Sequence, residues 1–179
     1  MKIIAFVGMP AAGKSVASDV VKEENIDVVN MGDVIRDEVK ARGLEPTDAN
    51  TGGVANDLRD KEGMDAVAKR CVPKIEALEK DLVVVDGVRG IAEVTFFKEH
   101  FGEDFTLVFI DAPLEIRFER VTNRGRSDDM TDIKALKVRD ERELGWGLAE
   151  AIKVADITVD NTDSIDAFRN TINGILENA

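Results

Sequence analysis

The sequence predicts an α/β fold of three layers (α/β/α), with a five-stranded parallel sheet between two layers of helices. Short apolar runs, typical of strands buried on both faces, alternate with amphipathic stretches of helical length. A glycine-rich loop also follows the first apolar run and precedes the first helical stretch. The predicted strands are Lys2–Val7, Asp27–Asn30, Leu82–Asp86, Phe105–Asp111 and Ile157–Val159.

Each strand is predicted from its apolar residues and from the helical stretch that follows it. The first strand reads Ile3-Ile4-Ala5-Phe6-Val7 without interruption, and the third contains Val83-Val84-Val85. Because ligands of parallel sheets bind beyond the carboxyl ends of the strands, we expect the functional residues just after each apolar run. The predicted helices are Val16–Val21, Asp33–Ala41, Met64–Leu78, Ala92–Phe101, Leu114–Val121, Asp132–Leu144 and Ile165–Leu176.

The loop after the first strand is a complete phosphate-binding loop. It reads Gly8-Met9-Pro10-Ala11-Ala12-Gly13-Lys14-Ser15 and matches G-x-x-x-x-G-K-[ST] in the strand–loop–helix context that the motif requires. Its backbone N–H groups would surround an anion at a helix N-terminus, which predicts a P-loop NTPase fold. We expect Lys14 to reach the β- and γ-phosphates of ATP and the Ser15 hydroxyl to hold Mg²⁺. The predicted nucleotide contacts here are Gly8, Pro10, Ala11, Ala12, Gly13, Lys14, Ser15 and Val16.

Composition narrows the classes of function. A chain of 179 residues fits one domain, which we expect to span residues 1–179. The formal net charge of −12 argues against a general nucleic-acid binder, which would need a basic face. The N-terminal apolar run is too short for a signal peptide or a membrane span, so we expect a cytoplasmic protein without a membrane partner. Cys71 and His100 are the only residues of their types, and we expect a packing role and a surface role for them.

Two segments interrupt the alternation of strands and helices. Residues 43–63 combine turn signals with a short polar helix, which fits a flap over an acceptor site and equally a plain solvated insertion. Residues 123–129 form a charged loop between two helices. We therefore place an acceptor-site insertion at about 31–80 and a short lid at about 120–131.

Charged residues follow the second and third strands. After the third strand, Asp86-Gly87-Val88-Arg89 ends an apolar run in a carboxylate and an arginine. We expect Asp86 to serve the Mg²⁺ site or the acceptor, and Arg89 to present a planar fork to a phosphate. After the second strand come Asp33 and Arg36, whose simplest interpretation from position alone is an N-cap and a surface charge.

A local group of arginines lies in the C-terminal half of this acidic chain. Phosphoryl transfer concentrates negative charge on the transferred oxygens, and arginines that close over them stabilise that charge and expel water. Alternatively, Asp128 and Asp129 neutralise their neighbours in an ion-paired helix hairpin. The group consists of Arg120, Arg124, Arg126 and Arg139.

Taken in order, these motifs resemble those of adenylate kinase and its nucleoside-monophosphate-kinase relatives. Gly32-Asp33-Val34-Ile35-Arg36 resembles their acceptor-site Gly-Asp-x-x-Arg, and Asp86-Gly87-Val88-Arg89 resembles their Asp-Gly-Phe-Pro-Arg. The four arginines from 120 to 139 resemble their lid arginines. The resemblance implies that Arg36 and Arg89 bind the acceptor. It also implies that Arg120 and Arg124 hold the donor triphosphate, and that Arg126 and Arg139 complete the transition-state cage.

A second resemblance concerns the C-terminal stretch 155–164, which resembles the Ala-Asp-x-x-Ile-x-Asn-x-x-Ser of dephospho-CoA kinases. It implies a loop for the donor adenine around Asn161, and it matches Asp33 to the carboxylate that activates an acceptor hydroxyl in that family. The chain departs from adenylate kinases at Glu93, where they place the glutamine that reads AMP, and a carboxylate only accepts hydrogen bonds. The whole chain resembles an archaeal family of small P-loop kinases that is related to both adenylate kinase and dephospho-CoA kinase. We expect Trp146 to be a packing anchor.

The sequence therefore predicts Mg²⁺- and ATP-dependent phosphoryl transfer to a small molecule. The acceptor is a nucleoside monophosphate, which needs no general base, or a hydroxyl compound such as dephospho-CoA. The alternative class is a nucleotide-driven switch or assembly factor with a macromolecular partner, and both monomer and homodimer remain open. The predicted catalytic residues are Lys14, Asp33, Asp86, Arg124 and Arg126. The predicted substrate contacts are Asp33, Arg36, Arg89, Glu93, Arg126 and Arg139, and the predicted metal ligands are Ser15 and Asp86.

Overall fold

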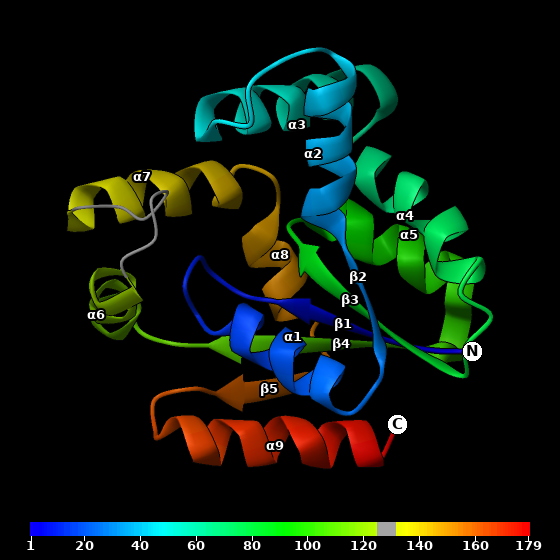
Figure 1. Ribbon diagram of the computed structural model, residues 1–179, viewed down its shortest axis with the longest axis vertical. Helices are drawn as coiled ribbons and strands as arrows, with labels where there is room; N and C mark the ends of the chain where they lie inside the picture. Colours follow the sequence, from blue (N-terminus) through cyan, green and yellow to red (C-terminus); the bar gives the residue numbers. More distant parts are fainter. Residues whose placement is uncertain (125–131) are drawn as a thin grey trace.

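Five parallel strands form one sheet, in the order β2-β3-β1-β4-β5 (Figure 1). The computed structural model describes residues 1–124 and 132–179, apart from the side chain of Arg124. The predicted α/β fold class and its five-stranded parallel sheet are confirmed. The predicted lid residues 125–131 lie outside the described ranges. The strands are β1 (Lys2–Val7), β2 (Asp27–Asn30), β3 (Leu82–Val88), β4 (Phe105–Asp111) and β5 (Ile157–Asp160).

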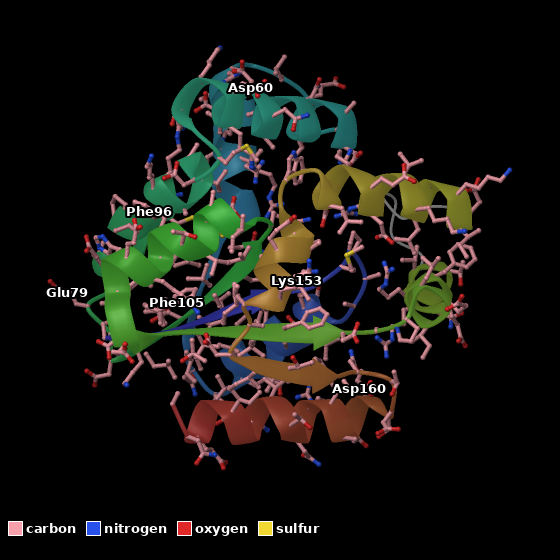
Figure 2. All side chains as sticks on the ribbon, turned by 180° about the vertical axis from the view of Figure 1, so that it is seen from behind. Asp60, Glu79, Phe96, Phe105, Lys153 and Asp160 are labelled. Atoms are coloured by element: carbon pink, nitrogen blue, oxygen red, sulfur yellow. The ribbon has the colours of Figure 1, made fainter. Side chains whose placement is uncertain are left out.

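Helices cover both faces of the sheet, because side chains of each strand point alternately to opposite sides. On one face, Ile4 and Phe6 of β1 pack with α1 and α9. On the other, Ile3 and Ala5 pack with α2 to α5 and with α8, and Figure 2 shows α5 and α8 over this face. The helices are α1 (Lys14–Glu23), α2 (Met31–Ala41), α3 (Asp48–Glu62), α4 (Ala66–Glu76), α5 (Ile91–Phe101), α6 (Leu114–Arg124), α7 (Ile133–Leu144), α8 (Leu148–Lys153) and α9 (Ile165–Glu177).

Several helices and strands begin or end at residues other than those predicted, because of local hydrogen bonds and backbone conformation. The N-cap of α2 is Asn30, whose Oδ1 accepts a hydrogen bond from the Gly32 N–H at 2.8 Å, and the N-cap interpretation of Asp33 is wrong. Strand β3 continues beyond Asp86 to Val88, through Gly87 at a φ of 98°. The short helix α8 was not predicted, because its six residues are too few to show a helical period.

The segment between β2 and β3 is almost entirely helical, since α2, α3 and α4 occupy it (Figure 1). Helix α3 has 15 residues rather than being short, and it buries Val54, Ala55 and Leu58 in the main core cluster. A plain solvated insertion would leave these residues exposed. The segment is therefore built into the core, and its first helix, α2, begins at the carboxyl end of β2.

The buried thiol of Cys71 packs in α4 with the core, as expected from its solitary occurrence. Burial raises its pKa to about 12, so the thiol stays protonated at neutral pH. Among the helices of residues 1–124 and 132–179, none combines the length and the apolar character needed to cross a bilayer.

Candidate functional site

A cavity of about 460 Å³ opens at the carboxyl edge of the sheet, where the phosphate-binding loop joins β1 to α1. The position agrees with the rule that parallel sheets bind ligands beyond their carboxyl ends. Most of the loop residues predicted to contact a nucleotide face this cavity. Those that line it are Pro10, Ala11, Gly13, Lys14, Ser15 and Val16.

The loop conformation depends on Gly13 and Lys14. Gly13 has a φ of 120°, and a Cβ atom there would lie 2.2 Å from Nδ2 of Asn161, so only glycine fits. Lys14 Nζ donates hydrogen bonds to the carbonyl oxygens of Gly8 at 2.7 Å and Met9 at 2.9 Å. The lysine thus lies across the mouth of the loop, where it would meet the phosphates of a nucleotide.

Asn161 and Arg120, which are distant in the sequence, donate hydrogen bonds to the backbone of the phosphate-binding loop. Asn161 Nδ2 donates to the carbonyl of Ala12 at 2.8 Å, and Arg120 donates to the same carbonyl at 3.3 Å. Arg120 also donates to the carbonyl of Asn161. Both residues were predicted to contact the donor nucleotide, and both line the cavity. Ile165 and Phe168 of α9 also line the cavity and give it an apolar surface suited to a base.

Arg117 is a buried support of the loop that the sequence interpretation missed. It donates to the carbonyl of Pro10 at 3.1 Å and makes two hydrogen bonds to Asp140 of α7, both at 2.9 Å. The side chain is 6% exposed. One signal was available: Arg117 lies on the buried stripe of its helix, three residues after Leu114 and four before Val121.

Lys14 is predicted to couple nucleotide binding to pH. Burial, with a further contribution from the charge of Arg89, lowers the pKa of Lys14 to about 8. A bound triphosphate would raise this pKa, so binding above it takes up one proton. Below pH 8 Lys14 is already protonated, so we expect its titration to leave the Mg·ATP dissociation constant unchanged. Above pH 8 we expect the constant to rise about tenfold per pH unit. Isothermal titration in buffers of different ionisation enthalpy measures both the constant and the proton uptake, and an unchanged constant up to about pH 9.5 would contradict the coupling.

Asp86 lies two residues before the end of β3 and beside Asn30 of β2, to which it is paired in the sheet register. Its Oδ2 accepts hydrogen bonds from Ser18 Oγ at 3.0 Å and Asn30 Nδ2 at 3.3 Å. Burial raises the pKa of Asp86, although Lys14 acts in the opposite direction. Asn30 is a second polar residue of this site that the sequence interpretation missed; its position at the end of a strand was the available signal.

Ser15 and Asp86 both line the cavity at the phosphate-binding loop, and they offer hydroxyl and carboxylate oxygens, the hard donors that Mg²⁺ prefers. In the described ranges, no group of three or more His, Cys, Asp or Glu residues could hold a metal ion. This donor set fits a Mg²⁺ that keeps water molecules and phosphate oxygens as its other ligands, which is how the ion is usually bound beside nucleotides.

A second cavity, of about 270 Å³, continues from the first beneath α2 and α3. Five residues line both cavities: Gly32, Arg36, Gly87, Arg89 and Arg139. The remaining wall combines apolar side chains, among them Met31, Ile35 and Trp146, with buried charges. The arginines predicted to contact the acceptor therefore lie at the junction between the two spaces.

The residues predicted to grip the acceptor are already paired with carboxylates of this chain. Arg36 donates to Asp33 Oδ1 from Nε at 3.0 Å, and both side chains are more than half exposed. In the described structure Asp33 is not among the residues that line the two cavities. Arg89 forms an ion pair with Glu143, a buried residue of α7 that the sequence interpretation missed.

Both carboxylate oxygens of Glu93 accept hydrogen bonds from other groups of the protein. Its Oε1 accepts from Arg59 at 3.0 Å, and its Oε2 accepts from the backbone N–H groups of Arg89 at 2.7 Å and Gly90 at 3.3 Å. It is 1% exposed, and burial raises its pKa against the opposing charge of Arg59. Glu93 therefore fixes the turn between β3 and α5, although it also lines the second cavity.

Trp146 closes the second cavity from the side of α7. Its Nε1 donates to Asn56 Oδ1 at 2.8 Å, and the guanidinium of Arg59 lies 4.4 Å from the ring centroid. These contacts agree with the expected packing role and also give the cavity an aromatic wall. The predicted lid residues Arg124 and Arg126 contribute nothing to this description, since the Arg124 side chain and Arg126 lie outside the described part of the chain.

Comparisons with known proteins agree with this architecture. A family model described as an AAA domain matches residues 7–137. A UPF0200 protein of Methanosarcina acetivorans is 59% identical over 178 residues, which cover 99% of this chain and 95% of that protein. The fold is similar to that of shikimate kinase from Aquifex aeolicus, with a TM-score of 0.55 and 21% identity over 98% of this chain and 96% of the other. It is also similar to that of a gluconokinase from Sinorhizobium meliloti, with a TM-score of 0.58 and 16% identity over 99% and 94% of the two chains.

Proposed function

This chain belongs to the UPF0200 family of archaeal proteins, and from that premise we propose that it is a kinase that transfers the γ-phosphoryl group of ATP to a small molecule. One observation carries the proposal: two cavities of about 460 and 270 Å³ meet at shared residues that include three arginines. The larger contains the phosphate-binding loop, and the smaller lies between the helices that follow β2 and residues of α7. A switch that only binds and hydrolyses a nucleotide needs no second cavity.

In this proposal the donor lies in the larger cavity with its phosphates on the loop amides and its base toward Phe168. Lys14 exchanges its contacts with the carbonyls of Gly8 and Met9 for the β- and γ-phosphates. Mg²⁺, held through Ser15 and Asp86, would neutralise charge on the same phosphates. The residues at the junction then place the acceptor in line with the γ-phosphate.

Arg139 and Arg89 share the carboxylate of Glu143, so two positive charges against one negative leave a single net positive charge where the transferred group crosses from one cavity to the other. Both line the two spaces, and their side chains are 30% and 25% exposed, so a bound ligand would remove much of their remaining water. Preorganised cations in a water-poor site stabilise the charge that develops on the transferred oxygens. No covalent intermediate and no histidine or cysteine is required by such a mechanism.

The test is a transfer assay with purified protein, Mg·ATP and single acceptors. The panel contains nucleoside monophosphates, nucleosides and dephospho-CoA, and also shikimate and gluconate, because two proteins of similar fold are named as kinases of these compounds. We expect ADP to appear in equal amount with one phosphorylated acceptor, followed by mass spectrometry. ATP hydrolysis without transfer to any acceptor, rising only when a cell extract is added, would instead identify a nucleotide-driven switch.

A further inference from the structure

The two carboxylate oxygens of Asp86 have different surroundings. Oδ2 accepts hydrogen bonds from Ser18 Oγ at 3.0 Å and from Asn30 Nδ2 at 3.3 Å. Within residues 1–124 and 132–179, no group donates to Oδ1, and Oδ1 is not one of the fully buried side-chain atoms that lack a partner. Because Asp86 lines the cavity at the phosphate-binding loop, Oδ1 is the oxygen that a ligand in this cavity can reach.

The hydroxyl of Ser18 is placed against Asp86 by the packing of α1 on the sheet. Asp86 lies on the same face of β3 as Val84, which belongs to the same core cluster as Ala17 and Val21 of α1. Ser18 is 5% exposed, and the burial of a hydroxyl costs free energy unless it is hydrogen-bonded. Among the described residues, Asp86 supplies that bond. The contact is therefore part of the packed interior.

The amide of Asn30 can take only one orientation. Its Oδ1 accepts from the Gly32 N–H at 2.8 Å, which caps α2, and from Arg36 Nη2 at 3.4 Å. An amide turned the other way would set its NH2 group against these two donors, so Nδ2 must face Asp86. The pairing of Asn30 with Asp86 in the sheet register brings the two side chains together. Asn30 is therefore a fixed donor to Oδ2.

The backbone of β3 is irregular directly after Asp86. The register of β1 with β3 passes from Phe6 opposite Asp86 to Val7 opposite Val88, and so it skips Gly87, whose φ is 98°. Bulges of this kind redirect side chains next to functional sites. The backbone and the two hydrogen bonds to Oδ2 together fix the direction of the carboxylate.

We propose that Ser18 and Asn30 are positioning residues of the Mg²⁺ site, because they hold Oδ2 of Asp86 and leave Oδ1 alone to face the ion or one of its water molecules. The inference rests on the proposed function, since it requires Mg·ATP in the cavity at the phosphate-binding loop. Hydrogen bonds to a metal-binding carboxylate fix its orientation, and their loss weakens metal affinity by about 10–100-fold. Neither residue needs to touch the ion or the nucleotide.

The test measures the contribution of the metal separately from that of the nucleotide. Isothermal titration gives the dissociation constant of the non-hydrolysable β,γ-imido analogue of ATP, once with excess Mg²⁺ and once in EDTA. The ratio of the two constants is the gain in affinity that the metal provides. We expect this gain to fall about tenfold in Ser18→Ala and in Asn30→Ser, with affinity for the metal-free analogue nearly unchanged.

Both variants should fold. Alanine is the best helix former at the position of Ser18, and serine is as good an N-cap for α2 as Asn30. Circular dichroism checks the fold, and if one variant does not fold, the other decides. Asn178→Ser, the same replacement on an exposed residue just after α9, is the control and should keep the wild-type gain.

A double-variant cycle shows whether Ser18 acts through Asp86. Ser18→Ala should lower the gain from Mg²⁺ in the wild-type protein and should have no further effect in Asp86→Ala. A further loss in the Asp86→Ala background would overturn the positioning role. The same holds for an unchanged gain in a folded variant, or for an equal loss of affinity with and without Mg²⁺.

These outcomes leave the kinase proposal standing. If the wild-type protein did not bind the analogue at all, with or without Mg²⁺, both the positioning role and the kinase proposal would be overturned.

Discussion

Replacing Lys14 by methionine will lower Mg·ATP turnover by on the order of 10³-fold, because the phosphate-binding loop then lacks its own positive charge. Methionine has a similar length and no charge. The lysine occupies the mouth of the loop through its contacts with Gly8 and Met9 at 2.7 and 2.9 Å. In the transition state its ammonium would lie against the oxygens that gain charge, where few other groups can replace it.

The fold should survive this change, since Lys14 itself lines a cavity that water can enter. ADP formation is measured with the acceptor found in the transfer assay, and circular dichroism checks the fold. Lys80→Met is the matched control, because Lys80 is 58% exposed and lies next to the amino end of β3, at the opposite edge of the sheet. If the Lys14→Met protein kept a tenth of the wild-type turnover or more, the phosphate-binding loop would have no part in the mechanism.

Replacing Arg117 by methionine will lower the free energy of unfolding by about 3–5 kcal/mol, because it leaves the buried carboxylate of Asp140 without its partner. The two side chains are 6% and 11% exposed and share two hydrogen bonds of 2.9 Å. The change also removes the donor to the Pro10 carbonyl, so we expect weaker Mg·ATP binding in the same variant. Urea denaturation followed by circular dichroism measures the first effect and isothermal titration the second.

Two controls separate the buried pair from arginine replacement in general. Arg169→Met breaks an ion pair with Glu23 whose side chains are 32% and 59% exposed, and exposed pairs contribute about 0–1 kcal/mol. The double variant Arg117→Met/Asp140→Leu should recover most of the lost stability, since an apolar pair can replace a buried ion pair. Mg·ATP binding should stay weak in the double variant. Equal stability losses for Arg117→Met and Arg169→Met would refute the buried-pair argument.

The sequence by itself determined the sheet and the phosphate-binding loop. The loop is local: strand β1, the loop and α1 follow one another, so the pattern from Gly8 to Ser15 and its apolar neighbours contain the structural information. The sheet pairs strands far apart in the sequence, and it was predicted from the repeated alternation of apolar strands with helical stretches. The same holds for the ends of strands, which led to Asp86 and Arg89. The boundaries that differed, such as the start of α2 at Met31 after the Asn30 cap, depend on single hydrogen bonds that periodicity does not resolve.

Only the tertiary structure decided which charges are free to act. Arg89 pairs with Glu143 across 54 residues, and Arg117 reaches Pro10 across 107, separations at which no sequence period exists. The sequence predicted Asp33 and Glu93 as substrate contacts because of their motifs, and the structure adds that Asp33 accepts from Arg36 and that Glu93 accepts from the backbone of the turn before α5. A charge in a motif is visible in the sequence, whereas its partner and its burial follow from how helices pack on the sheet.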